Sequence, residues 1–398
     1  VPVFIDNDPV TGNARANQLA AAYVEGKTKA VMMAHTLGNP FDVGAVLEFC
    51  RKYDLWLIED NCDALGCTYS MPISKAIQFG SVTAQAKGGK FKCVNPVAHL
   101  DLQLDTYTAP TGSFGDLSTQ SFYPPHHLTM GEGGAVNIVH RPPLKTYAES
   151  FRDWGRDCWC ASGKDDTCGK RFQWQLGELP KGYDHKYIYS HLGYNLKPLD
   201  PQAAIGRQQL KKLPAFIEAR KQNWETLRRG LAHLEEFFEF SLPTHATRWV
   251  PPAERRADGN SPLSSQSSIF EWDSSGCRTN CSWFGFMLRV KPTAPFTHTD
   301  LGRHLDAKKI GNRMLFGVNL LRQPVFVQLR KDRPQALRVI DSDGLSLPTA
   351  ELELRLRSSI HCESSSPLPG ADNLMHRALS LGTYPGLTSS MINHEIQV

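Results

Sequence analysis

The sequence predicts an α/β protein with a mostly parallel sheet covered by helices on both faces, followed by a smaller α+β domain. Two observations predict this class. The first sixty residues alternate short apolar runs with stretches of helical spacing, as in a parallel sheet with crossover helices. Further along, Pro214 interrupts one long helical stretch, which marks a joint between domains. We expect two domains, over 1–200 and 201–398.

The predicted elements follow one another in chain order, and "LWLIED" and "WFGFMLRV" are the most apolar strands among them. A helix near the C-terminal half begins at Thr299, whose hydroxyl is suited to cap it. The expected strands are 1–6, 29–35, 55–60, 133–140 and 283–290, and the expected helices are 13–26, 42–54, 143–155, 200–237 and 298–310.

Three segments lack clear periodicity. Residues 68–110 have mixed polarity, and so long a stretch without regular structure is uncommon inside a compact domain, so we interpret it as an insertion. Residues of about 245–280 and 335–370 are polar and include "ERRADGNSPLSSQSS" and "HCESSSPLPG". Their composition predicts loops or disorder, interrupting the second domain.

Composition excludes several classes of function. The net charge is only +4 and no block of five or more basic residues occurs, so nucleic acid is not the expected partner. No apolar run reaches the roughly 18 residues that span a bilayer, so no membrane association is expected. No secretory signal is recognisable, which predicts a cytoplasmic protein. The ten cysteines are then better interpreted as metal-binding, catalytic or buried than as disulfides.

Candidate ligand-binding residues lie where predicted strands end. His35, Asp60 and Cys62 are at the carboxyl ends of strands, the edge at which parallel sheets bind ligands. Asp60 is either a carboxylate that caps the next turn or the partner of a protonated heterocycle nitrogen. In a pyridoxal enzyme, that ion pair keeps the ring positive so that it can take up electrons.

A second candidate site is the loop that contains Cys158, Cys160 and Cys168. Three cysteines so close together rarely arise from packing alone, and the loop is rich in Gly and Asp rather than apolar. Cys62 is the best candidate for a fourth ligand, because its strand end lies on the ligand-binding edge. A zinc ion with four thiolates and a [2Fe–2S] cluster are both compatible with this set.

The loop "SFYPPHHLTMGEGG" is the third candidate. It places His126 and His127 between Ser121, a candidate anion-binding residue, and a glycine-rich turn. A pair of surface histidines is the simple interpretation. The functional one is a general base, because imidazole exchanges protons near neutral pH. A histidine cannot form the Schiff base that a lysine would form.

Three stretches resemble the DegT/DnrJ/EryC1/StrS sugar aminotransferase family of fold-type-I pyridoxal-phosphate enzymes: "LWLIEDNCDALG", "GSFGDLSTQSFYPPHHLTMGEGGAV" and "HLGYNLKPLDPQAAIGRQQL". In ordinary members, a lysine four residues after the "SF" motif bonds covalently to the cofactor. His126 stands at that position here. This exchange, with "AHTLGNP", "ESFRDWGRDCWC" and "YPGLT", resembles the branch of CDP-4-keto-6-deoxy-D-glucose 3-dehydrases of 3,6-dideoxysugar and lipopolysaccharide biosynthesis.

The resemblance implies an enzyme that uses pyridoxamine 5′-phosphate (PMP) and a [2Fe–2S] cluster to remove the C3 hydroxyl of a CDP-4-keto-6-deoxyhexose. It implies a separate NADH-dependent flavin and iron–sulfur reductase as electron donor, and a homodimer. His126 is implied as the base. The other implied roles are the pyridine nitrogen partner Asp60, the phosphate ligand Ser121, Asn195 reaching the neighbouring subunit's cofactor, the pocket residues Tyr123, Asp63, Phe316 and Arg322, and the cluster ligands Cys62, Cys158, Cys160 and Cys168.

The sequence also departs from the family pattern. The chain starts at Val1 inside an expected strand, so we expect the N-terminal part of the family fold, with its phosphate-binding turn, to be absent. Residues 68–110 separate "DALGCTY" from "GSFGD", which are nearly contiguous in relatives, as read-through of non-coding sequence would produce. These departures keep an alternative open. It is a catalytically degenerate homologue that acts as a binding or dimerisation protein with a structural metal.

Overall fold

The computed structural model describes residues 1–84, 91–140, 143–160, 163–255, 269–359 and 365–398. The first half of the chain contains a four-stranded sheet in the order β10–β9–β3–β2. Strands β2, β3 and β9 are parallel, and β10 is antiparallel to β9, so the predicted mostly parallel sheet is confirmed. These strands are β2 (Ala30–Ala34), β3 (Trp56–Asp60), β9 (Leu117–Ser121) and β10 (Gly134–Ile138).

Helix α2 (Val43–Lys52) makes the crossover between β2 and β3, as the sequence predicted. Its side chains Val43, Val46 and Leu47 are buried at helical spacing against the sheet. The carboxylate of Asp42 caps the helix by accepting a hydrogen bond from the Ala45 N–H at 3.0 Å. The crossover therefore fixes where β3 ends, and with it the position of Asp60.

The N-terminal segment differs from its prediction. Strand β1 (Val3–Phe4) pairs in parallel with β17 (Arg338–Val339) rather than with the four-stranded sheet. The helix expected over 13–26 shrinks to η1 (Ala16–Gln18) and the single turn α1 (Leu19–Ala22). The reason is tertiary, since Gln18 accepts from the Asp6 N–H and donates to the Asp341 carbonyl. These bonds tie the chain start to residues far along the sequence.

Residues 68–110 are not devoid of regular structure, which corrects that part of the prediction. Strand β4 lies antiparallel between β8 and β14 (Arg278–Asn280). Tyr69, Met71 and Tyr107 are fully buried and alternate along their strands with partly exposed residues, a period-2 pattern over only five residues in each strand. That the segment is an insertion stays a prediction. Its elements are β4 (Thr68–Pro72), α3 (Ile73–Gln78), β5 (Val82–Ala84), β6 (Phe91–Cys93), β7 (His99–Asp101) and β8 (Thr106–Pro110).

The second half of the chain is built on the antiparallel sheet β11–β15–β18–β16. Trp224 and Trp283 stack at 4.6 Å in its core. Helix α7 is capped by Thr297 rather than by Thr299, because Thr297 forms a capping box with Asp300. The elements are β11 (Phe238–Phe240), β15 (Gly285–Val290), α7 (His298–Ala307), β16 (Asn312–Met314), α8 (Pro324–Asp332), α10 (Pro369–Arg377), β18 (Ala378–Gly382) and α11 (Ser389–Gln397).

The two polar segments are also more ordered than predicted. Strand β12 (Ala246–Trp249) pairs with β13 (Phe270–Trp272), and α9 (Thr349–Ser358) follows β17. A few apolar side chains decide this outcome, since Trp249 and Leu352 are buried in separate cores despite their polar surroundings. The remainder of the prediction, over 256–268 and 360–364, lies outside the described residues.

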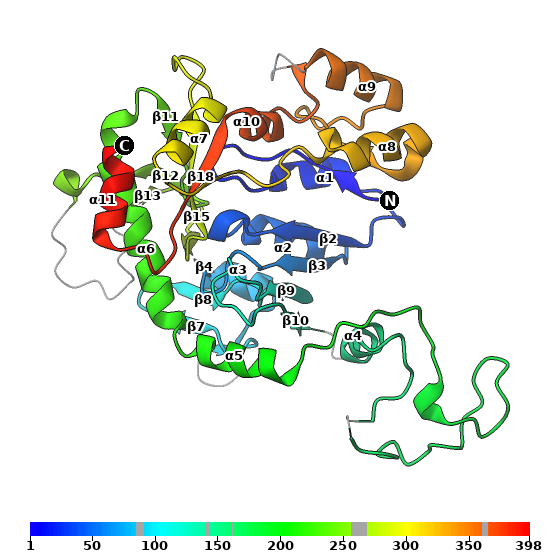
Figure 1. Ribbon diagram of the computed structural model, residues 1–398. Helices are drawn as coiled ribbons and strands as arrows, with labels where there is room; N and C mark the ends of the chain where they lie inside the picture. The colour runs from blue at the N-terminus through cyan, green and yellow to red at the C-terminus, as the bar shows by residue number, and fades with distance from the viewer. Residues whose placement is uncertain (85–90, 141–142, 161–162, 256–268, 360–364) are drawn as a thin grey trace.

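The long helical stretch breaks where Pro214 predicted, into α5 (Asp200–Leu210) and α6 (Leu213–Gly230). Before it, α4 (Leu144–Arg152) leads into residues 153–198, which we call the arm. Figure 1 shows the arm projecting away from the sheets. Among the described residues, no helix is long and apolar enough to span a bilayer. The division into domains at residue 200 stays a prediction.

Candidate active site

His126 and Asp63 meet beside the end of β9. The loop that carries His126 closes on itself, because the Phe122 N–H donates to the Gly133 carbonyl at 2.9 Å. Nε2 of His126 lies 3.3 Å from Oδ1 of Asp63. Nδ1 is buried and has no hydrogen-bond partner among the described residues. The carboxylate thus favours the proton on Nε2 and leaves the Nδ1 lone pair free to accept another.

Two aromatic rings enclose the His126 imidazole. The Tyr123 ring meets it edge-on with centroids 4.6 Å apart, and the Phe284 ring meets it edge-on at 5.4 Å. Tyr123 is itself exposed, so it forms the outer side of the site. The sequence predicted Tyr123 and Asp63 here. Phe284 comes from the chain entering β15 of the second domain, and no sequence signal identified it.

His127 has a different environment from its neighbour. Its side chain is 2% exposed, and Nε2 lies 2.7 Å from the Ser282 carbonyl oxygen. Burial, followed by the nearby Arg220 charge, lowers the pKa of His127 to about 3. The ring is therefore neutral and donates its Nε2 hydrogen to Ser282. This bond anchors the His126 loop to the second domain.

Asp60 has the position predicted for a partner of a cofactor ring nitrogen. Its Oδ1 accepts from the Thr119 hydroxyl and from the Cys62 N–H, both at 3.1 Å. Thr119 is its register partner on β9, so the sheet fixes the carboxylate. Ser121 ends β9 two residues further on, and Tyr123 follows it. A fixed carboxylate and a free buried imidazole nitrogen near one sheet edge fit a pyridoxamine cofactor.

Glu59 is a buried residue that sequence reasoning missed. Its carboxylate accepts from the N–H groups of Gly112, Phe114 and Gly115 at 2.7–2.8 Å. It also lies 3.1 Å from Nε2 of His35. Burial would raise the pKa of Glu59, but His35 and the backbone donors outweigh burial and lower it. His35, a predicted candidate at a strand end, thus binds Glu59, which in turn holds the loop before β9.

Three further predicted residues are Arg322, Phe316 and Asn195, and the structure shows other surroundings for each of them. Arg322 forms a bidentate ion pair with the buried carboxylate of Asp372, with contacts of 2.7 and 2.5 Å, which gives it a structural role. Phe316 is 59% exposed with φ of +45°, so simple core packing does not explain it. Asn195 is exposed in the arm, where its backbone bridges Asp153.

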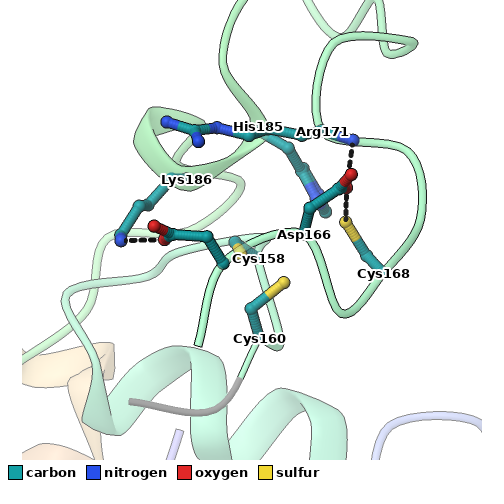
Figure 2. Close-up of a pocket in the computed structure, with 8 residues that line it drawn as sticks. Cys158, Cys160, Asp166, Cys168, Arg171, His185 and Lys186 are labelled. Carbon is teal, nitrogen blue, oxygen red and sulfur yellow. Dashed lines mark hydrogen bonds and ion pairs between the residues drawn. The ribbon is translucent and has the colours of Figure 1, made fainter. Parts of the chain in front are cut away.

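The three cysteines of the arm come together. Cys158, Cys160 and Cys168 line one small pocket, together with His185 (Figure 2). The thiols of Cys158 and Cys168 are close enough to Cys160 to influence its pKa. The Thr167 hydroxyl is the largest of the contacts that lower the pKa of Cys160 to about 7. Two ion pairs border the pocket, Lys186 with Asp165 and Arg171 with Asp184.

Cys62 does not join this group. It lies beyond β3, with Sγ 3.9 Å from the Thr119 hydroxyl, and burial followed by Asp60 raises its pKa to about 12. No three His, Cys, Asp or Glu side chains in the described part of the chain are arranged to hold a metal ion. A four-thiolate cluster therefore does not fit one chain as it is folded here, and no chemical step is derived through it.

Comparison with known proteins identifies the family. The model of the DegT/DnrJ/EryC1/StrS aminotransferase family matches residues 1–253. The chain belongs to this family. It is 39% identical over its whole length to the lipopolysaccharide biosynthesis protein RfbH of Salmonella typhimurium. It is 36% identical to dTDP-4-dehydro-2,6-dideoxy-D-glucose 3-dehydratase of Saccharopolyspora spinosa. The chain covers 67% and 64% of these relatives, about two thirds of their length.

Solved structures agree on the fold of this family member. The E. coli GDP-4-keto-6-deoxy-D-mannose-3-dehydratase with bound hydrated PLP superimposes with a TM-score of 0.60. It is 19% identical, and the match covers 99% of this chain and 73% of that one. At this identity the likeness concerns the fold alone. The predicted fold of pyridoxal-phosphate-dependent aminotransferases is thereby confirmed.

Proposed function

We propose that this protein is a pyridoxamine-dependent sugar-nucleotide 3-dehydratase that acts in the cytoplasm on a 4-keto-6-deoxyhexose. One observation carries the proposal. At the position of the family lysine, His126 presents a buried, unpartnered Nδ1 while Asp63 faces Nε2. The names of relatives support the reaction, since 3-dehydratases occur among them. The CDP-linked sugar of dideoxysugar biosynthesis is proposed from the sequence resemblance.

Each residue of the site has a task in this proposal. When bound, PMP supplies an amino group that joins the C4 ketone and a ring that takes up electrons. Nδ1 of His126 accepts the proton that leaves the cofactor's methylene carbon. Asp63 stabilises the resulting imidazolium across 3.3 Å. Asp60 balances the positive ring nitrogen, Ser121 holds the phosphate, and Tyr123 covers the outer side of the His126 ring.

The partners of the enzyme are proposed on the same basis. We propose a homodimer in which Asn195 of the projecting arm reaches the neighbouring subunit's cofactor. Cys62, Cys158, Cys160 and Cys168 are proposed as [2Fe–2S] ligands on the sequence resemblance, and the shared pocket of the three arm cysteines supports this for those three. A separate NADH-dependent flavin and iron–sulfur reductase is the proposed electron donor. Phe316 and Arg322 remain candidate substrate contacts, Arg322 only if its ion pair with Asp372 opens.

Replacing His126 tests the proposal. The full chain is reconstituted with iron and sulfide, loaded with PMP and given CDP-4-keto-6-deoxyglucose together with dithionite in place of the proposed reductase, and loss of the C3 hydroxyl is followed by mass spectrometry. We expect His126→Asn to slow the reaction by roughly 10²–10⁴-fold, the usual contribution of a general base. The matched control is His99→Asn at an exposed histidine of β7, which should keep the wild-type rate. An unchanged rate in His126→Asn overturns the assignment. A wild-type chain that binds PMP without reacting supports the degenerate homologue.

A further inference from the structure

The second half of the chain contains a mostly apolar cavity of about 470 Å³, and the described residues that line it include none of the proposed active-site residues. One side is formed by the sheet, through side chains such as Phe238, Leu288 and Leu381. Helices α7 and α11 form two further sides. The cavity is partly open to solvent, so a ligand has a route of entry. Its volume and its apolar lining are typical of a small-molecule binding site.

Helix α11 is packed against the rest of the chain, so the cavity has a defined wall on this side. In Figure 1, α11 lies beside α6. Helix α6 presents Gly230 at this contact, and a Cβ on that glycine would lie 2.4 Å from Cδ1 of Ile396. Ile392 is 4% exposed and belongs to the core of this half. The Thr388 hydroxyl caps the helix by accepting from the Met391 N–H at 3.3 Å. The side chains that α11 turns toward the cavity are therefore held in place.

Glu395 of α11 places a carboxylate in the apolar lining. Its Oε2 is buried and has no hydrogen-bond partner among the described residues. Burial raises the pKa of Glu395 to about 7, and the nearby His394 opposes this only in part. A buried acceptor without a donor is unfavourable, and more so when it is charged. The cavity thus offers one acceptor for a donor that a ligand would bring.

The other polar side chains of the cavity favour a cation over an anion. Asp300 lines it and accepts from the N–H and the hydroxyl of Thr297, at 3.0 and 2.7 Å. His304 lies one turn further along α7. No lysine or arginine is among the described residues that line the cavity. An anionic head group would therefore meet two carboxylates and no fixed cation, whereas an ammonium group would pair with Glu395.

We propose that this cavity binds a small amphiphilic amine, whose apolar body lies between α7, α11 and the sheet and whose ammonium group donates to Oε2 of Glu395. The site goes beyond the proposed dehydratase reaction, because it shares no described lining residue with the His126 site. Burial of the apolar body supplies affinity, and the charge-assisted hydrogen bond selects the head group.

Three ligands of matched shape test the choice of head group on the full chain. 2-Phenylethylamine carries an ammonium group, 2-phenylethanol a neutral hydroxyl and 3-phenylpropanoate a carboxylate. Affinities are measured by isothermal titration calorimetry at about pH 8, where most of the Glu395 carboxylate is ionised. We expect the amine to bind wild type about tenfold more tightly than the alcohol, as a hydrogen bond to a charged group implies, and the carboxylate to bind most weakly.

Variants locate the binding site. Glu395→Gln should bind the amine about tenfold more weakly and lose the preference for it over the alcohol. The matched control is Glu236→Gln, at an exposed glutamate outside the cavity, which should bind all three ligands as wild type does. Leu301→Trp fills part of the cavity and should weaken binding of both the amine and the alcohol. Thermal unfolding shows whether each variant folds.

Several results would overturn the proposal. These are a wild-type chain that binds no amine, equal affinity of wild type for the amine and the alcohol, and unchanged amine binding in Glu395→Gln. Amine binding that Leu301→Trp leaves unchanged would place the ligand elsewhere and has the same consequence. The ligand series on wild type and the Leu301→Trp variant still decide the question if Glu395→Gln does not fold.

Discussion

At the scale of single residues, two adjacent histidines have separate tasks. His126 lies between Tyr123 and Phe284 with a free Nδ1, whereas His127 donates to the Ser282 carbonyl. Arg220 donates to the next two carbonyls, those of Trp283 and Phe284, at 3.2 and 3.3 Å. The segment 282–284 is thus held from two sides. Through Phe284, its position determines where the His126 ring can lie.

Replacing His127 should misplace the base without unfolding the chain. His127→Phe keeps the ring shape but removes the donor to Ser282, and we expect kcat for dehydration to fall about tenfold with little change in KM. His127→Gln, whose amide can replace the Nε2 donor, should recover most of the rate. Hydrogen exchange of the peptide covering 121–134 should speed up only in His127→Phe. Equal exchange in both variants would contradict the anchoring role.

Glu59 should matter for stability more than its single charge suggests. In Glu59→Gln, an amide NH₂ replaces an acceptor that faces backbone N–H groups, and we expect a loss of about 3 kcal/mol in the free energy of unfolding. Urea unfolding at pH 7 measures this. Glu48→Gln on the exposed side of α2 is the control and should change little. A loss below about 1 kcal/mol would show that the buried network tolerates the amide.

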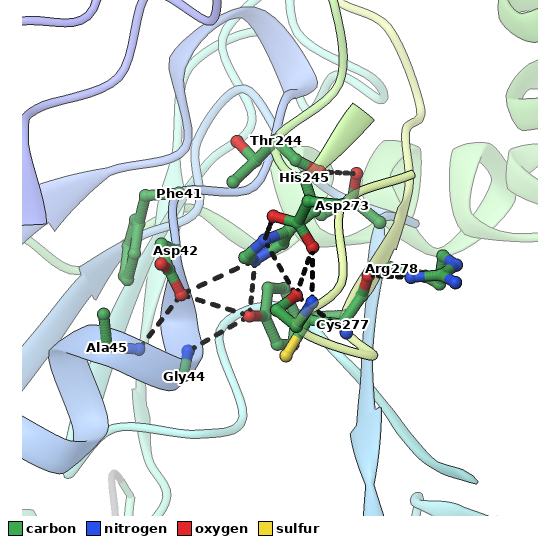
Figure 3. Close-up of polar contacts among 12 residues, drawn as sticks. Phe41, Asp42, Gly44, Ala45, Thr244, His245, Asp273, Cys277 and Arg278 are labelled. Carbon is green, nitrogen blue, oxygen red and sulfur yellow. Dashed lines mark hydrogen bonds and ion pairs between the residues drawn. The ribbon is translucent and has the colours of Figure 1, made fainter. Parts of the chain in front are cut away.

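At the scale of elements, a polar junction around His245 and Asp273 connects two elements of the first half of the chain, α2 and β4, to the second half (Figure 3). Nδ1 of His245 lies 2.9 Å from Asp273, and its Nε2 lies 2.8 Å from the Tyr69 hydroxyl of β4 and 3.5 Å from Asp42, the cap of α2. Burial would lower the pKa of His245, but the two aspartates outweigh it and raise the pKa. The protonated ring thus binds two carboxylates.

This junction predicts a pH dependence of stability. A raised His245 pKa contributes stability that is complete below the unfolded value of about 6.5 and is lost as pH rises through the folded value. The lowered pKa values of Asp42 and Asp273 contribute stability that is lost in acid, as pH falls from about 4 through their folded values. We expect the thermal unfolding temperature of His245→Asn not to decline above pH 6.5. Asparagine is the replacement because it tolerates the positive φ of +73° at this position. A wild-type decline retained in the variant would place its origin elsewhere.

At the scale of the whole molecule, the arm should decide assembly. Leu192 and Leu196 are exposed in the single chain, and burial against a partner would remove their apolar surface from water. We expect Leu192→Glu with Leu196→Glu to convert the dimer into a monomer in gel filtration. The thermal unfolding temperature of the chain should change little, because neither the Leu192 nor the Leu196 side chain packs in a core. A variant that remains dimeric would assign the interface to another surface.

The sequence by itself determined the parallel strands, the break at Pro214 and the candidate roles of His126, Asp60 and the arm cysteines, because periodicity and motif spacing are local properties. It did not determine the partners of β1, the burial of Tyr69 and Trp249, or the anchoring of His127 on Ser282. These depend on contacts between residues far apart in the chain. Only the tertiary structure showed that the three arm cysteines line one pocket and that Cys62 is not among the residues lining it, because side-chain grouping follows from packing and not from spacing.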